Sequence, residues 1–196
     1  NAEKTKEAGR SSGGIEVYVR SGLQIAVTTE RPKTLPGQSI VVRLKTLNGS
    51  RECDTAIIAY YLSTDEPRQE KEAYFGRIEK TCTDLQRDNV QTIMVSDANA
   101  KRKDAAGSKK QNQAGTLQRE VERATGHERK EPTSRIKWTC RSPATKTKRA
   151  GKSIIDHLSV QRENAGVIAQ RSVTLDQGHR LRTDHTAIRW RLRIKP

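Results

Sequence analysis

Residues 89–100 read NVQTIMVSDANA, an apolar run that changes without a break into a polar cluster. The run from Val90 to Val95 is rich in β-branched residues, which is typical of a buried strand. An aspartate and an asparagine then stand at its C-terminal end. Caps and turns use the same residue types, so the cluster alone is a weak signal. Asp97 and Asn99 are nevertheless the first candidates for a functional site.

The chain upstream predicts further strands and one helix. Four apolar runs with strand character are separated by proline, glycine and Asn-Gly turn signals, at residues 15–19, 23–27, 40–44 and 56–61. The next segment, 66–86, instead repeats apolar side chains every three or four positions, at Phe75, Ile78, Cys82 and Leu85. This spacing predicts an amphipathic helix, and either Thr64 or Asp65 is available as its N-cap.

Residues 101–135 contain few apolar side chains, and Lys, Arg, Gln and Glu dominate. We predict a basic loop or disordered insert over this range. Its first three residues, Lys101, Arg102 and Lys103, are candidates for contacts with the phosphates of a nucleic acid. A solvated run of charges is the alternative interpretation, and it is the more common one.

Two more strands are predicted near the C-terminus. Residues 154–158 are apolar except for Asp156 and His157. Residues 188–194 alternate Ile, Trp, Leu and Ile with arginine, so one face of this strand packs inward and the other is cationic. Because strands outnumber helices and a helix lies between strands, we predict a layered α+β or α/β domain rather than an all-β barrel.

The charge of the 196-residue chain favours a polyanionic partner. Lys and Arg number 38 against 23 Asp and Glu, which gives a net charge of +15. Such an excess attracts nucleic acid through counterion release, although it also keeps a protein soluble without any partner. Hydrophobic residues make up only 32% and aromatic residues 4%, so the folded state is expected to be marginally stable.

Several classes of protein and site find no support in the sequence. Cys53, Cys82 and Cys140 are far apart and form no CxxC pair of the kind used in zinc or redox sites. There is no Gly-x-x-x-x-Gly-Lys phosphate loop. No run approaches the roughly 18 apolar residues of a membrane-spanning helix, and the first residues are polar. An intracellular protein without a membrane partner is therefore expected.

Polar clusters stand beside three of the predicted strands: Asp97 with Asn99, Asp156 with His157, and Asp184 with His185. Phosphodiester hydrolysis needs carboxylates for a divalent cation, an oriented water, and a donor that stabilises charge in the transition state. Together these residue types supply all three. A hard cation such as Mg²⁺, or Mn²⁺ in its place, prefers such oxygen ligands.

The order of several tracts resembles that of the endonuclease/exonuclease/phosphatase superfamily. AYYLSTD at 59–65 is similar to its Tyr-Ala-Pro-Thr-Asp segment, and residues 89–100 to its strand ending in Gly-Asp-(Phe/Ala)-Asn-Ala. WTCRSP at 138–143 and IDH at 155–157 are similar to its Trp-x-x-x-Ser-Pro turn and Ile-Asp-(His/Tyr) strand. TDH at 183–185 is similar to its Ser-Asp-His box.

The resemblance covers residues 12–195 and is to the endonuclease domains of non-LTR retrotransposons and the craniofacial development protein 2-like proteins derived from them. It implies a partial α+β fold of the DNase I-like kind, a β-sandwich flanked by helices. One domain at 13–196, with the basic loop at 101–135 inside it, would follow a polar tail at 1–12. A monomer located in the nucleus is also expected.

The resemblance implies roles for four residues around a scissile phosphate. Asp97 would orient or deprotonate the attacking water, and Asn99 would help to hold that water and the phosphate. His185 would contact the phosphate and stabilise its charge. Asp156 would hydrogen-bond the imidazole and so fix its tautomer and orientation. His157 is expected to face away from the site because its neighbour faces in.

The resemblance also implies a metal site and a further phosphate contact. Asp184 would lie beside Mg²⁺ or its waters, with Asp97 as the second residue of the metal site. Tyr61 matches the phosphate-contacting tyrosine of the superfamily, although Leu62-Ser63 follows it where the superfamily has Ala-Pro.

Three departures from the superfamily pattern bear on activity and stability. Nothing before Gly13 matches the Asn-bearing strand and Glu-bearing segment with which the superfamily begins, so the domain is expected to be N-terminally incomplete. In the superfamily, that glutamate is the main metal ligand. Ser96 replaces a glycine and adds a side chain at a tight turn. The segment between Ala100 and Trp138 lacks the apolar helix of the relatives, so part of a sheet face is expected to be uncovered.

Three functional hypotheses remain open. The first is a retrotransposon-type endonuclease that hydrolyses nucleic acid, DNA rather than RNA, with Mg²⁺. The second is a non-catalytic remnant that binds nucleic acid through its Lys and Arg surface. The third is a decayed element fragment without a function.

Overall fold

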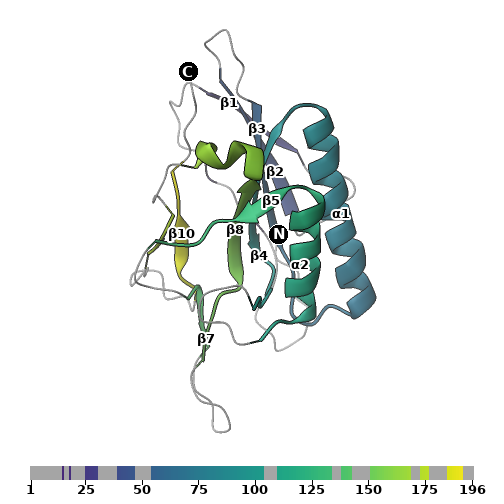
Figure 1. Ribbon diagram of the computed structural model, residues 1–196, viewed down its shortest axis with the longest axis vertical. Helices are drawn as coiled ribbons and strands as arrows, with labels where there is room; N and C mark the ends of the chain where they lie inside the picture. The colour runs from purple at the N-terminus through teal and green to yellow at the C-terminus, as the bar shows by residue number, and fades with distance from the viewer. Residues whose placement is uncertain are drawn as a thin grey trace.

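A six-stranded mixed sheet runs through the middle of the computed structural model (Figure 1). In sheet order its strands are β1 (Ile25–Glu30), β2 (Ser39–Thr46), β3 (Asp54–Tyr61), β4 (Gln91–Asp97), β8 (Asp156–Gln161) and β5 (His127–Arg129). Neighbouring strands are antiparallel except β3 and β4, which are parallel. The structure describes Ile15, Tyr18 and residues 25–30, 39–46, 54–103, 110–133, 138–142, 151–168, 173–176 and 185–191.

The parallel pair β3 and β4 is joined by the long helix α1 (Arg68–Arg87). The four apolar residues that predicted this helix are all buried on it, which confirms the predicted spacing. Its N-cap is Pro67, not Thr64 or Asp65, and no side chain caps it. The fixed φ of proline suits a helix start, whereas the Thr64 hydroxyl donates to the Asp65 carboxylate within the preceding turn.

A second helix, α2 (Gln113–Ala124), occupies part of the range expected to be a loop. The Asn112 side chain caps it by accepting a hydrogen bond from the N–H of Gly115. A Cβ at position 115 would lie 2.1 Å from the carbonyl oxygen of Lys101, so glycine permits the close approach of the two segments. Figure 1 shows α1 and α2 side by side on one face of the sheet. The expectation of an uncovered face was therefore wrong.

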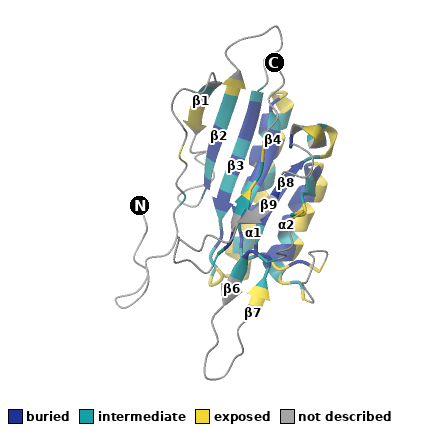
Figure 2. Cartoon of the chain, turned by 90° about the vertical axis from the view of Figure 1, so that its left-hand side faces the viewer, coloured by how far each residue is buried: buried dark blue, intermediate teal, exposed yellow. Residues whose placement is uncertain are grey.

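Apolar residues pack on both faces of the sheet. One cluster joins β3 and β4 to the helices and includes Ile58, Phe75 and Val121. The other cluster lies on the opposite face and includes Ile93 of β4, and the partly buried Trp190 packs against this cluster. This second face meets the two-stranded sheet of β9 (Thr174–Asp176) and β10 (Ala187–Arg189). Figure 2 shows the buried residues following the central strands, and the predicted α+β class is confirmed.

The smaller elements complete the described part of the chain. They are the hairpin of β6 (Cys140–Ser142) and β7 (Gly151–Ser153), and the 3-10 helix η1 (Arg162–Val167). No helix in the described ranges is long and apolar enough to cross a membrane. Of the strand predicted over 15–19, only Ile15 and Tyr18 are described, and neither belongs to a strand. The end of the last predicted strand, beyond residue 191, lies outside the described residues.

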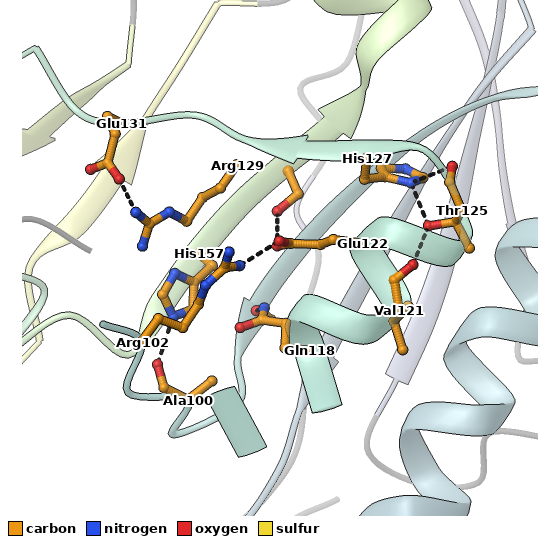
Figure 3. Close-up of polar contacts among 12 residues, drawn as sticks. Ala100, Arg102, Gln118, Val121, Glu122, Thr125, His127, Arg129, Glu131 and His157 are labelled. Carbon is orange, nitrogen blue, oxygen red and sulfur yellow. Dashed lines mark hydrogen bonds and ion pairs between the residues drawn. The ribbon is translucent and has the colours of Figure 1, made fainter. Parts of the chain in front are cut away.

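Arg102 is buried rather than displayed to a phosphate. Its side chain is 4% exposed and forms an ion pair with the Glu122 carboxylate of α2 (Figure 3). Glu122 also accepts a 2.6 Å hydrogen bond from the Ser159 hydroxyl of β8. A buried cation needs a buried anion, and this pairing corrects the prediction that Arg102 contacts nucleic acid. Lys101 and Lys103 are exposed, so their phosphate contacts stay a prediction.

Removal of this cation should destabilise the fold. In Arg102→Met the Glu122 carboxylate stays buried without its ion-pair partner, and the free energy of unfolding should fall by about 3–5 kcal/mol in urea denaturation. The double variant Arg102→Met/Glu122→Gln should recover much of that loss. Lys103→Met is the exposed control and should change stability by no more than about 0.5 kcal/mol. Equal losses of unfolding free energy in Arg102→Met and Lys103→Met would contradict the buried ion pair.

His127 should make stability depend on pH. Burial lowers its pKa from 6.5 to about 4, against the opposing effect of hydrogen bonds to the backbone carbonyls of Thr92 and Thr125. Between about pH 6.5 and 4 the unfolded chain binds this proton and the folded chain does not. The contribution of His127 to the free energy of unfolding should thus be fully present above pH 6.5. It should be lost as pH drops through this window, which lowers the free energy of unfolding by up to about 3 kcal/mol.

Urea denaturation across this window measures the dependence. His127→Gln should flatten the slope of unfolding free energy against pH, whatever its effect at neutral pH. A variant that keeps the wild-type slope would assign the acid sensitivity to other groups.

Candidate active site

Two aspartates face each other where β4 ends and β8 begins. In the antiparallel register of these strands Asp97, the last residue of β4, pairs with Asp156, the first residue of β8. On the other side of β4, Tyr61 at the end of β3 pairs with Asp97 in the parallel register. The ends of three strands thus bring together side chains that are far apart in the sequence.

The imidazole of His185 lies between the two carboxylates. Its Nδ1 is 3.2 and 3.1 Å from the two carboxylate oxygens of Asp156, and its Nε2 is 3.9 Å from Oδ2 of Asp97. An ionised carboxylate only accepts hydrogen bonds, so Nδ1 carries the proton that is donated to Asp156. This arrangement fixes the orientation of the ring and turns Nε2 toward Asp97. The ring is about one-third exposed, at 32%, and is accessible to a ligand.

Asn99 adjoins this group in a strained backbone conformation. Its φ is 48°, in the left-handed region that asparagine tolerates better than most residues. The turn lets its backbone N–H donate to the Asp97 carboxylate at 3.4 Å and its side-chain amide donate to the Leu62 carbonyl at 3.0 Å. Asn112, the cap of α2, donates to the Asn99 carbonyl at 2.8 Å. The predicted residue Asn99 is therefore held beside Asp97 from two directions.

Tyr61 is partly buried beside the carboxylates. Burial raises the pKa of its phenol, and the negative charge of Asp97 raises it further. The phenol therefore keeps its proton at neutral pH and can donate a hydrogen bond to an anion. The register next to Asp97 is compatible with the expected phosphate contact, which stays a prediction.

Two neighbours of the site residues turn away from the site. Ser96 is buried, and its hydroxyl accepts a 2.9 Å hydrogen bond from Gln118 of α2, so the side chain that replaces a glycine is accommodated. His157 is also buried, and its Nε2 lies 2.8 Å from the Ala100 carbonyl oxygen (Figure 3). It faces away from the acidic pair, as the alternation along a strand requires. Asp184 lies outside the described residues.

Sequence reasoning missed two residues that hold the site. Asn112 accepts hydrogen bonds from the N–H groups of Lys101 and Gly115, both at 2.9 Å. Thr139 accepts from the N–H of Asp156 at 3.1 Å. A polar residue before a helical stretch is a common N-cap signal and could have located Asn112. No local pattern marks Thr139, because its role depends on a contact 17 residues away.

Several solved structures share this fold. The catalytic domain of APE2 from Xenopus laevis superposes with a TM-score of 0.59 and 14% identity, over 81% of this chain and 57% of that one. A 3'-5' exonuclease from Neisseria meningitidis gives 0.56 and 16%, over 86% and 71%. TDP2 from Caenorhabditis elegans gives 0.50 and 17%, over 84% and 49%. All three belong to one fold, that of the endonuclease/exonuclease/phosphatase superfamily.

The chain has the endonuclease/exonuclease/phosphatase fold. It spans little more than half of the APE2 domain and about half of TDP2. No protein-family model and no curated protein matches the chain in sequence. The endonuclease/exonuclease/phosphatase fold therefore rests on the three-dimensional similarity and on the motifs that the structure places at its strand ends.

The side-chain atoms of Asp97, Asp156 and His185 partly match the ligands that a hard divalent cation prefers. Oxygen atoms of Asp97 and Asp156 and a ring nitrogen of His185 all lie within 4.8 Å of one another. Carboxylate oxygens are the ligands that Mg²⁺ and Mn²⁺ prefer, and water can complete the coordination of Mg²⁺. The Nδ1 of His185 is engaged with Asp156, so the two aspartates are the better ligands. Within the described ranges no glutamate joins this group.

Binding of Mn²⁺ should raise the unfolding temperature of the protein, because a ligand that binds only the folded state stabilises it. Asp97→Asn removes one negative ligand and should abolish most of this rise. Asp88→Asn, at an exposed aspartate after α1, is the matched control and should keep it. The metal site would be refuted by a rise that is the same in both variants, measured by thermal denaturation with and without the ion.

Proposed function

We propose that the chain hydrolyses phosphodiester bonds of nucleic acid at the group of Asp97, Asp156 and His185. The observation that carries the proposal is the hydrogen bond from His185 Nδ1 to the Asp156 carboxylate, with Nε2 directed toward Asp97. An imidazole oriented by one carboxylate beside a second carboxylate is suited to proton transfer and to stabilising negative charge. The endonuclease/exonuclease/phosphatase fold and a 3'-5' exonuclease among its similar structures support the choice of reaction.

Each residue has a definite task in this proposal. Asp97 accepts a proton from the attacking water or orients it, with Asn99 holding the turn that follows. His185 donates from Nε2 to a phosphate oxygen when both ring nitrogens carry protons. Asp156 accepts from Nδ1 in either state of the ring and keeps it in place. Tyr61 donates to another phosphate oxygen.

Mg²⁺ or Mn²⁺ is the proposed cofactor, held by Asp97 and Asp156, with Asp184 beside it as the superfamily motif suggests. When bound, such a cation polarises the phosphate and activates water. The proposed substrate is DNA, supported by the net charge of +15 and by the exposed Lys101 and Lys103. We also propose the retrotransposon-type assignment, a monomer, nuclear location and the domain boundaries 13–196.

A second candidate function is binding of nucleic acid without catalysis. It is supported by the same positive charge. In the described part of the chain, no glutamate joins the cluster of Asp97, Asp156 and His185, which also supports it. A protein of this kind would bind many sequences alike, with an affinity that falls steeply as salt rises.

Nicking of supercoiled plasmid DNA separates the two functions. The protein is expected to nick in Mg²⁺ or Mn²⁺ and to stop when the ion is chelated. Asp97→Asn and His185→Gln should each slow nicking by about 100-fold or more, because each removes a group used in proton transfer or charge stabilisation. Asp88→Asn should nick like the unmodified chain.

Two results would overturn hydrolysis. Nicking that is equal in the unmodified chain and in both site variants would mean that the activity belongs to a contaminant. Folded protein that binds DNA with a steep salt dependence but does not nick would establish the binding function instead.

A further inference from the structure

Thr139 joins the two halves of the Asp156–His185 pair. Its hydroxyl oxygen accepts hydrogen bonds from the N–H groups of Ile155 at 3.0 Å and Asp156 at 3.1 Å. Its backbone carbonyl accepts a 2.7 Å hydrogen bond from the N–H of Thr186, the residue after His185. One residue thus contacts the backbone on both sides of the pair. Its side chain is buried, with only 1% of the residue exposed.

The segment around Thr139 is itself fixed to the protein. Its N–H donates to the Ser153 carbonyl at 2.9 Å, and β6 and β7 pair immediately beyond it. Cys140, the next residue, forms a backbone bridge with His185. The start of β8 and the His185 segment are therefore both attached to the β6–β7 hairpin, and Thr139 is the point at which the two attachments meet.

The geometry at Asp156 makes this contact relevant to chemistry. Asp156 is the first residue of β8, and its side chain is placed by the backbone at that position. Without an acceptor, the buried N–H of Ile155 and the part-buried N–H of Asp156 would have to move to find other partners. A shift of the carboxylate relative to the imidazole weakens the bond to Nδ1 and with it the preference of the ring for one tautomer.

We infer that Thr139 is a positioning residue, which sets the distance between the Asp156 carboxylate and His185 Nδ1 and so selects the Nδ1–H tautomer of His185. The effect of Thr139 on catalysis rests on the proposed function. Its structural consequence, the tautomer, does not. Thr139 contacts neither the substrate nor the reacting atoms and acts only through the Asp156–His185 pair.

Two substitutions separate the hydroxyl from the bulk of the side chain. Thr139→Val keeps the shape but removes the acceptor, and Thr139→Ser keeps the acceptor but removes a methyl group. Thr81→Val is the matched control, because Thr81 is a buried threonine of α1 whose hydroxyl donates to the Arg77 carbonyl of the same helix. Circular dichroism first shows which variants fold.

The tautomer is measured by NMR, from the ¹⁵N chemical shifts of the His185 ring at alkaline pH with a metal chelator and no substrate. The unmodified chain, Thr139→Ser and Thr81→Val should show the Nδ1–H form. Thr139→Val should show a mixture of both tautomers. If Thr139→Val folds and keeps the pure Nδ1–H form, the inference is overturned. If Thr139→Val does not fold, Thr139→Ala is measured instead. Folded Thr139→Ala should then show a mixture of tautomers, and a pure Nδ1–H form in this variant would overturn the inference.

Kinetics then tests the part that depends on the proposed function. Thr139→Val should lower kcat for plasmid nicking by on the order of 10–100-fold with little change in KM, and Thr139→Ser should restore most of the rate. An altered tautomer in a protein that never nicks would leave the positioning role standing and reject only the proposed reaction. An unaltered kcat in a protein whose site variants are inactive would reject the catalytic role of Thr139.

Discussion

The antiparallel register of β4 and β8 is the constraint on which the candidate site depends. It pairs Asp97 with Asp156, and a slip by one residue would turn one carboxylate to the opposite face of the sheet. The register is fixed by burial on both faces, since Met94 packs toward the helices while Ile93 and Leu158 pack toward the second apolar cluster. Core packing a few residues away therefore brings the two aspartates together, and no attraction between the aspartates themselves is needed.

The site is held from two sides by polar contacts, of which the Arg102–Glu122 ion pair and the Thr139 side chain are buried. On the α2 side, Asn112 holds the turn after β4 and the Arg102–Glu122 ion pair anchors the residues that follow. On the hairpin side, Thr139 connects the start of β8 to the segment of His185. A chain with only 32% hydrophobic residues relies on such contacts to order its loops, and satisfied buried polar groups specify geometry more sharply than apolar contacts do.

Much of this architecture could be predicted from the sequence, and the failures have physical causes. Period-two and period-3.6 patterns located β2, β3, β4 and α1, and the motif residues Asp97, Asp156 and His185 meet at one place. Helix α2 was missed because its buried face carries glycine, glutamine and glutamate, whose burial depends on partners far away in the chain. Arg102 was misassigned for the same reason: a charge run does not reveal which cation is paired inside the protein.

Three residues from distant segments form one group in this structure, and the nuclear Overhauser effect from the ring protons of His185 tests that grouping most directly. We expect cross-peaks from the imidazole to the β-protons of Asp156 and of Asp97, since its two nitrogens lie 3.1 and 3.9 Å from oxygens of these carboxylates. A folded protein whose His185 ring shows cross-peaks to neither aspartate would contradict the account.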